Sequence, residues 1–173
     1  MVTYSFILTF EPEFQEKLYT YAESLNKEID TSYKLERDTI PHITVVKFES
    51  EKELSSDQVS KLRSLLPIDI KVTLGGLTLL PSHSGGTWIE ISVYNSIVLG
   101  SVQKRILEAL EGMDVEIKSG TNNNFRPHIT LSKAKEKNNL NIKELDENIV
   151  RTEGTKVELV FGYYKGIELK LLN

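Results

Sequence analysis

At 173 residues, the chain is long enough for one domain or for two small lobes that share one core. It contains no cysteine, which excludes disulfide scaffolds, thiolate nucleophiles and cysteine-based zinc or iron–sulfur sites. The net charge of −4 argues against a broad electrostatic grip on duplex nucleic acid, but it allows a locally basic pocket for a nucleotide or one RNA end.

Strand-like and helix-like segments alternate through the first half of the chain. Alternating β-branched and aromatic residues indicate strands, and apolar residues three or four apart behind a Pro or Ser cap indicate helices. In chain order these patterns predict a strand over residues 3–10, a helix over 12–25, a strand over 40–48, a helix over 55–66 that Pro67 closes, and a loosely alternating segment over 68–80 with a bend at Gly75 and Gly76.

The second half continues the alternation and ends in an expected hairpin. We predict a strand over 87–94 with Trp88 in the core, a helix over 96–110 ended by Gly112, strands over 113–118 and 125–133, a short helix within 142–149, and strands over 156–161 and 166–172 joined by a turn at 162–165. Because strands outnumber helices and several are close enough to pair as hairpins, the expected fold class is α+β with antiparallel sheets.

The amino-terminal residues 1–10 indicate a first strand, because they lack the basic stretch that opens a signal peptide. No apolar stretch approaches the roughly 20 residues that cross a bilayer. We therefore expect a cytoplasmic protein with no membrane partner, acting as a monomer.

One tetrapeptide occurs twice, as Pro41-His42-Ile43-Thr44 and as Pro127-His128-Ile129-Thr130. At residue frequencies of roughly one in twenty, a second chance copy has a probability on the order of one in a thousand. Side chains alternate between the faces of a strand, so each copy presents its histidine and threonine on one face and its isoleucine on the other.

This set of side chains suits phosphodiester chemistry. A neutral histidine can take a proton from an attacking hydroxyl or water, and a protonated one can give a proton to the leaving oxygen. Threonine hydroxyls can donate to the non-bridging phosphate oxygens and stabilise the growing charge. Each strand offers only one metal ligand, so we expect neither a metal nor another cofactor.

The paired His-x-Thr motifs resemble those of the 2H phosphoesterase superfamily, which includes the bacterial LigT-like 2′-5′ RNA ligases and cyclic phosphodiesterases. Residues 40–48 are similar to its first motif and residues 125–131 to its second. Residues 72–76, the loop from Pro81, and residues 88–91 also resemble the stretch between the two motifs. LigT-like members often carry an arginine shortly after the second motif, where this chain has Lys133.

The resemblance implies one bilobal domain over residues 1–173, with two antiparallel β-sheets, flanking helices, a pseudo-two-fold arrangement and a cleft between the lobes. It implies hydrolysis of a 2′,3′-cyclic phosphate, a 2′-5′ linkage or a cyclic oligonucleotide. His42 and His128 would be catalytic, and Thr44 and Thr130 would bind the phosphate. The expected partner is a nucleotide or an RNA end.

Other side chains are weaker candidates for contact with the substrate. The expected contacts are Arg126, Tyr163, Tyr164, Lys165 and His83. Lys47 would also bring positive charge near the phosphate, although strict alternation turns it away from the histidine face.

Two alternative functions use the same residues. The reverse reaction would join RNA ends through a 2′-5′ linkage, because acid and base exchange roles in the two directions. A nucleotide or RNA-end binding module would keep the cleft without turnover, although a binder has no need for an acid and a base together.

Overall fold

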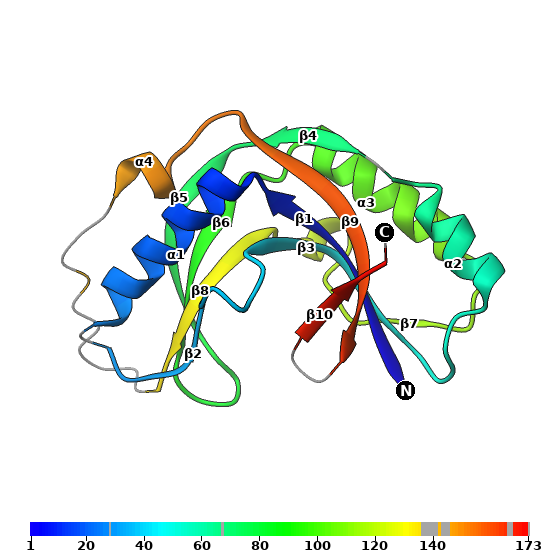
Figure 1. Ribbon diagram of the computed structural model, residues 1–173, viewed down its shortest axis with the longest axis horizontal. Coiled ribbons are helices and arrows are strands. Elements are labelled where there is room, and N and C mark those ends of the chain that lie inside the picture. Colours follow the sequence, from blue (N-terminus) through cyan, green and yellow to red (C-terminus); the bar gives the residue numbers. More distant parts are fainter. Residues whose placement is uncertain (28, 67, 136–141, 143–145, 166–167, 173) are drawn as a thin grey trace.

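The computed structural model describes residues 1–27, 29–66, 68–135, 142, 146–165 and 168–172 (Figure 1). The strands are β1 (Val2–Phe10), β2 (Thr31–Lys34), β3 (His42–Ser50), β4 (Asp69–Val72), β5 (Leu74–Pro81), β6 (Thr87–Val93), β7 (Glu116–Ile117), β8 (His128–Ala134), β9 (Thr155–Lys165) and β10 (Glu168–Leu171). The helices are α1 (Pro12–Asn26), α2 (Ser56–Arg63), α3 (Ile97–Leu110) and α4 (Glu147–Val150), and Asn122–Asn124 forms a 3-10 turn.

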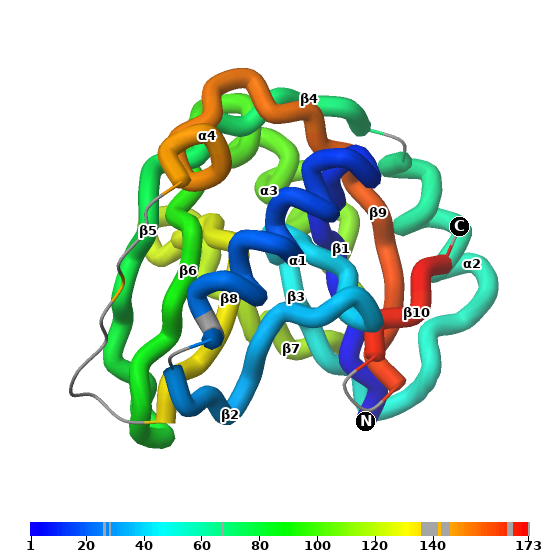
Figure 2. Tube along the Cα trace, turned by 60° about the vertical axis from the view of Figure 1, so that its left-hand side comes forward, coloured from blue at the N-terminus to red at the C-terminus, as the bar shows by residue number. Residues whose placement is uncertain are grey.

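All strand pairs are antiparallel, and the main order is β10-β9-β1-β3-β8-β6-β5. The sheet bends into an arch, with α1 and α4 outside one leg and α2 and α3 outside the other (Figure 1). Figure 2 shows the two legs as separate walls, β5, β6 and β8 in one and β1, β9 and β10 in the other. The expected α+β fold with an antiparallel sheet and flanking helices is confirmed.

The expectation of two separate sheets is wrong. The two walls belong to one sheet that contains all ten described strands, because β3 and β8 pair where Ile43 lies opposite Ile129. This is the only residue pair between these strands in the described part of the chain, so the sheet is continuous but narrow at its centre. The junction lies within the two copies of the repeated tetrapeptide.

The core lies between the outer face of the arch and the helices. Phe6 and Phe161 stack with ring centroids 4.5 Å apart, and Phe48 adds a third, nearly parallel ring. Ile43 and Ile129 are fully buried on this outer face. Burial of the isoleucines therefore leaves the histidines and threonines on the inner face of the arch.

Two predicted helix starts are confirmed by their caps. The Ser55 side chain accepts from the backbone N–H of Gln58 and the Gln58 side chain accepts from the backbone N–H of Ser55, a complete capping box. Ser96 caps α3 by accepting from the Leu99 N–H. None of the described helices is long and apolar enough to cross a membrane.

Several details differ from the sequence-based expectations. Residues 162–165 are not a turn but continue β9, which runs on to Lys165 because they pair with β1 or β10. β2 was not predicted, since its four residues carry a mixed polar pattern. Trp88, which was predicted to lie in the core, is half-buried on the inner face of the arch, and Ile89 and Ile91 are the fully buried residues of this strand. Pro67 and most of the link after Lys135 lie outside the described residues.

Candidate active site

The two copies of the motif meet in one small cavity at the centre of the arch. Ile43 pairs antiparallel with Ile129, so the flanking positions place His42 across from Thr130 and Thr44 across from His128. The cavity has a volume of about 30 Å³. Its lining consists of the four motif side chains His42, Thr44, His128 and Thr130 together with Tyr33, Leu35, Ile40 and Pro41.

Both imidazoles are anchored in the same way. Nδ1 of His42 lies 2.7 Å from the carbonyl oxygen of Ile40, and Nδ1 of His128 lies 2.8 Å from that of Arg126. A carbonyl oxygen only accepts, so Nδ1 must carry the proton in both rings. Nε2 is therefore the nitrogen of each ring that remains for proton exchange, with a lone pair when the ring is neutral or an N–H when it is charged.

The surroundings of His42 favour its neutral form. Burial lowers the pKa of His42 below its ordinary value of about 6.5, and the Ile40 carbonyl opposes this shift. Nearby positive charge from His128 and Lys47 lowers the pKa of His42 further. At neutral pH the Nε2 of His42 is thus available to accept a proton.

His128 has a carboxylate beside it that the sequence analysis missed. Glu90 on β6 is only 4% exposed, and its Oε1 lies 3.4 Å from Nε2 of His128. Its other oxygen, Oε2, accepts from Nη1 of Arg126 at 2.6 Å. An acidic residue within the apolar run Trp88-Ile89-Glu90-Ile91 was the available signal, because buried carboxylates are rare unless they are paired.

A bulge follows each motif and changes which side chains face inward. Val45 has no partner in the β1–β3 register, and Leu131 has none in the β6–β8 register. Each bulge inserts one residue and so reverses the alternation. Lys47 and Lys133 consequently lie on the same face as the histidines, in contrast to the expectation for Lys47 from strict alternation.

The secondary candidates are divided between the two faces and the rim. Tyr164 lies on the inner face, where its ring contacts Lys47, whereas Tyr163 packs on the other face against Tyr4. Lys165 is exposed at the end of β9, and His83 is exposed in the β5–β6 loop. None of these four residues lines the central cavity.

Arg126 differs from those four candidates because it is tied to the site indirectly. Its backbone carbonyl holds the ring of His128, and its side chain, half exposed, is paired with Glu90.

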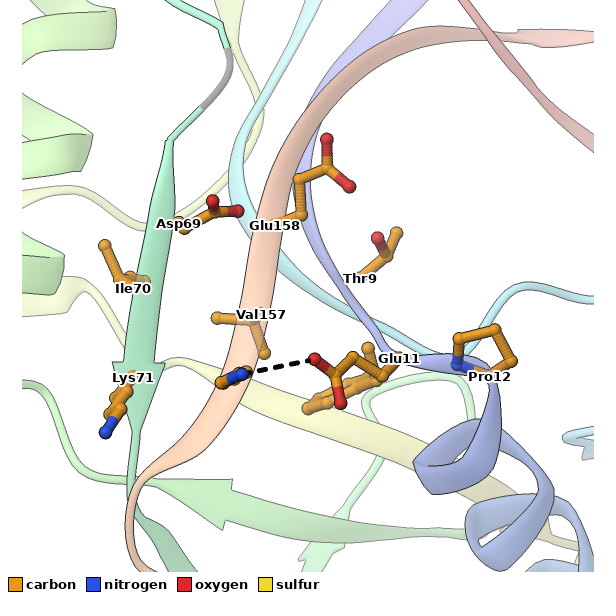
Figure 3. A pocket seen from close by; sticks show the side chains of 10 residues that line it. Thr9, Glu11, Pro12, Asp69, Ile70, Lys71, Val157 and Glu158 are labelled. Carbon is orange, nitrogen blue, oxygen red and sulfur yellow. Dashed lines mark ion pairs between the residues drawn. The ribbon is translucent and has the colours of Figure 1, made fainter.

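A larger cavity of about 490 Å³ lies at the ends of β1, β4 and β9 (Figure 3). Among its lining residues, Nζ of Lys156 lies 3.8 Å from Oε1 of Glu11. The lining also contains Asp69 and Glu158, but no histidine. Within the described residues, no three His, Asp or Glu side chains gather closely enough to hold a metal ion. The chemistry of the side chains therefore selects the smaller, central cavity as the candidate site.

The family model of the 2′-5′ RNA ligase superfamily matches residues 12–155, a range that includes both motifs. The chain belongs to this superfamily. The resemblance to 2H phosphoesterases inferred from the paired motifs is thereby confirmed.

Solved structures and curated proteins add little to the family match. This chain aligns with two structures of Kluyveromyces marxianus Usb1, one of them with uridine monophosphate. The TM-score is 0.49 in both cases, at 12% and 11% identity, and the alignments cover 99% of this chain and 97% of each Usb1 chain. No curated protein matches the sequence.

Proposed function

We propose that this protein is a metal-independent phosphodiesterase that hydrolyses a 2′-5′ linkage, a 2′,3′-cyclic phosphate or a cyclic oligonucleotide. One observation carries the proposal: both histidines line one small cavity while a backbone carbonyl holds each Nδ1, which leaves each Nε2 for proton transfer. Two imidazoles fixed in this way around one small space match the needs of paired general acid and base catalysis.

The environments of the two rings assign their roles. His42, whose pKa is lowered, is the base, and its Nε2 takes a proton from the attacking water or hydroxyl as the new phosphorus–oxygen bond forms. His128, with the Glu90 carboxylate beside its Nε2, is the acid. It gives its proton to the leaving ribose oxygen as the old phosphorus–oxygen bond breaks.

The two threonines complete the site. The hydroxyls of Thr44 and Thr130 donate to the non-bridging oxygens of the phosphate, where charge increases in the transition state. Glu90 is a positioning residue, because it acts on the substrate only through His128 and Arg126.

The test is hydrolysis of nucleoside 2′,3′-cyclic phosphates, 2′-5′ oligoadenylates and cyclic oligonucleotides in the presence of EDTA. We expect turnover of at least one substrate class, and His42→Ala and His128→Ala should each lower kcat by about 10²- to 10⁴-fold while binding persists. Thr44→Val and Thr130→Val should each cost about 10²-fold.

The third histidine provides a matched comparison. His83→Ala removes an exposed imidazole that does not line the cavity, so its effect on kcat should be at least tenfold smaller than that of either motif variant. Unchanged substrate across the whole panel at high protein concentration would contradict the proposal. Binding without turnover would instead indicate a binding module, and product formed only by joining ends would indicate a ligase.

A further inference from the structure

The repeat extends beyond the tetrapeptide to a lysine. Both copies follow the pattern Pro-His-Ile-Thr-x-x-Lys, which ends at Lys47 in β3 and at Lys133 in β8. The exposure pattern is the same in both, with proline and isoleucine buried and histidine, threonine and lysine half-buried. The bulges at Val45 and Leu131 place both lysines on the face of the arch that carries the histidines.

Each ammonium group rests on an aromatic ring. Nζ of Lys47 lies 4.8 Å from the ring centroid of Tyr164, and Nζ of Lys133 lies 5.0 Å from that of Trp88. Such contacts hold a lysine in place by cation–π attraction without neutralising its charge. Nζ of Lys133 also donates to Oγ of Ser84 at 2.7 Å.

Neither lysine has an acidic partner among the residues that the structure describes. No carboxylate among the described residues lies within 4 Å of either ammonium group, although many other lysines of this acidic chain are paired with Glu or Asp. An ammonium group with ring contacts but no counter-charge retains N–H donors for an anion. Phosphate is the anion that the site between them is proposed to act on.

The lysines lie at opposite ends of the central cavity. β3 and β8 run antiparallel through Ile43 and Ile129, so Lys47 continues one wall beyond Thr44 and Lys133 continues the other beyond Thr130. Because of the bulges, each lysine is the next inward-facing residue after its threonine. That spacing is about 7 Å along a strand, so each lysine lies one inward-facing position beyond the threonine that is proposed to bind the central phosphate.

We propose that Lys47 and Lys133 bind the two phosphates that flank the phosphate held between the histidines, so that the substrate is an oligonucleotide with at least three consecutive phosphates. This inference rests on the proposed function for the position of the central phosphate, and it narrows the substrate class. A nucleoside 2′,3′-cyclic phosphate has one phosphate, which would occupy only the position between the histidines. A 5′-phosphorylated trinucleotide or a cyclic trinucleotide also reaches both lysines.

The test measures equilibrium binding to the slow His42→Ala variant, so that it does not depend on turnover. The probes are 5′-phosphorylated 2′-5′-linked triadenylate, the cyclic triadenylate, and 2′-5′-linked ApA, which has a single phosphate. Lys47→Met and Lys133→Met should each weaken binding of triadenylate about tenfold more than binding of ApA, because each removes one charged hydrogen bond. Each should also reduce the slope of log Kd against log salt by about 0.7.

Lys61→Met is the matched control, because Lys61 is exposed on α2, on the outer side of the arch. This substitution should leave both the Kd for triadenylate and the slope of log Kd against log salt unchanged. The linear and cyclic probes show which arrangement of the three phosphates the site prefers. Equal losses for triadenylate and ApA, or unchanged salt slopes, would overturn the inference while leaving the phosphodiesterase proposal standing. If triadenylate binding depends on the lysines but the wild-type protein turns over no substrate, the phosphodiesterase proposal would be overturned while the inference about the lysines would stand.

Discussion

At the scale of single residues, the site depends on what holds each imidazole. The two rings share the anchor from Nδ1 to a carbonyl two residues earlier, but they differ at Nε2. His42 is partly buried and has positive charge nearby, whereas Nε2 of His128 lies beside the buried Glu90 carboxylate. This difference gives two identical tetrapeptides opposite proposed roles.

The carboxylate of Glu90 can be tested by Glu90→Gln, which keeps the shape and removes the charge. We expect kcat to fall about tenfold with little change in KM, because the amide no longer holds the His128 ring and the Arg126 side chain as the carboxylate does. The measurement is kcat and KM of the variant, determined separately.

The control for this change is Glu111→Gln, an exposed acid at the end of α3 on the outer side of the arch, which should leave kcat and KM unchanged. An unchanged kcat, or a rise in KM alone, would contradict the positioning role of Glu90.

At the scale of elements, a glycine allows the β5–β6 loop to pack closely against the end of β8. Gly86 has φ +76°, and a Cβ built on it would lie 2.1 Å from the carbonyl oxygen of Ala134. The neighbouring Gly85 has φ +86° but open space around it. The same loop carries Ser84, which accepts from Lys133.

These two glycines separate backbone strain from steric contact. Gly85→Ala should lower the free energy of unfolding by about 1 kcal/mol, the cost of a positive φ for alanine. Gly86→Ala should lower it by at least about 1 kcal/mol more, because the loop must also move away from β8. Urea denaturation of both variants measures the difference, and equal losses would show that the loop is not packed as described.

Local sequence patterns were sufficient to predict most helices and strands, but not the bulges. Helices with a Ser cap and an apolar stripe, and strands with clear alternation, lie close to their predicted positions. The bulges at Val45 and Leu131 were not predictable, because each depends on the register of a neighbouring strand. They decide the side on which Lys47 lies, so the lysine face could not be read from local sequence.

At the scale of the whole molecule, the repeat predicted the essential arrangement. Two strands with the same motif were expected to face each other, and the pairing of Ile43 with Ile129 brings them together. Nothing in the sequence indicated that this pair joins the two walls into one curved sheet, because the junction needs only a single residue from each strand. The buried Glu90 was missed for a similar reason, since its partners Arg126 and His128 lie on another strand or close to its start.

The central claim is that each wall of the arch contributes one half of an acid–base pair, and the pH dependence of kcat/KM tests it most directly. We expect a bell-shaped profile whose acid limb has its midpoint below about 6.5, because the lowered pKa of His42 keeps this base neutral to lower pH than an ordinary histidine. The residual activity of His42→Ala should lack the acid limb, and that of His128→Ala should lack the basic limb. A profile without these limbs in the wild-type protein, or an acid limb that persists without His42, would contradict the claim.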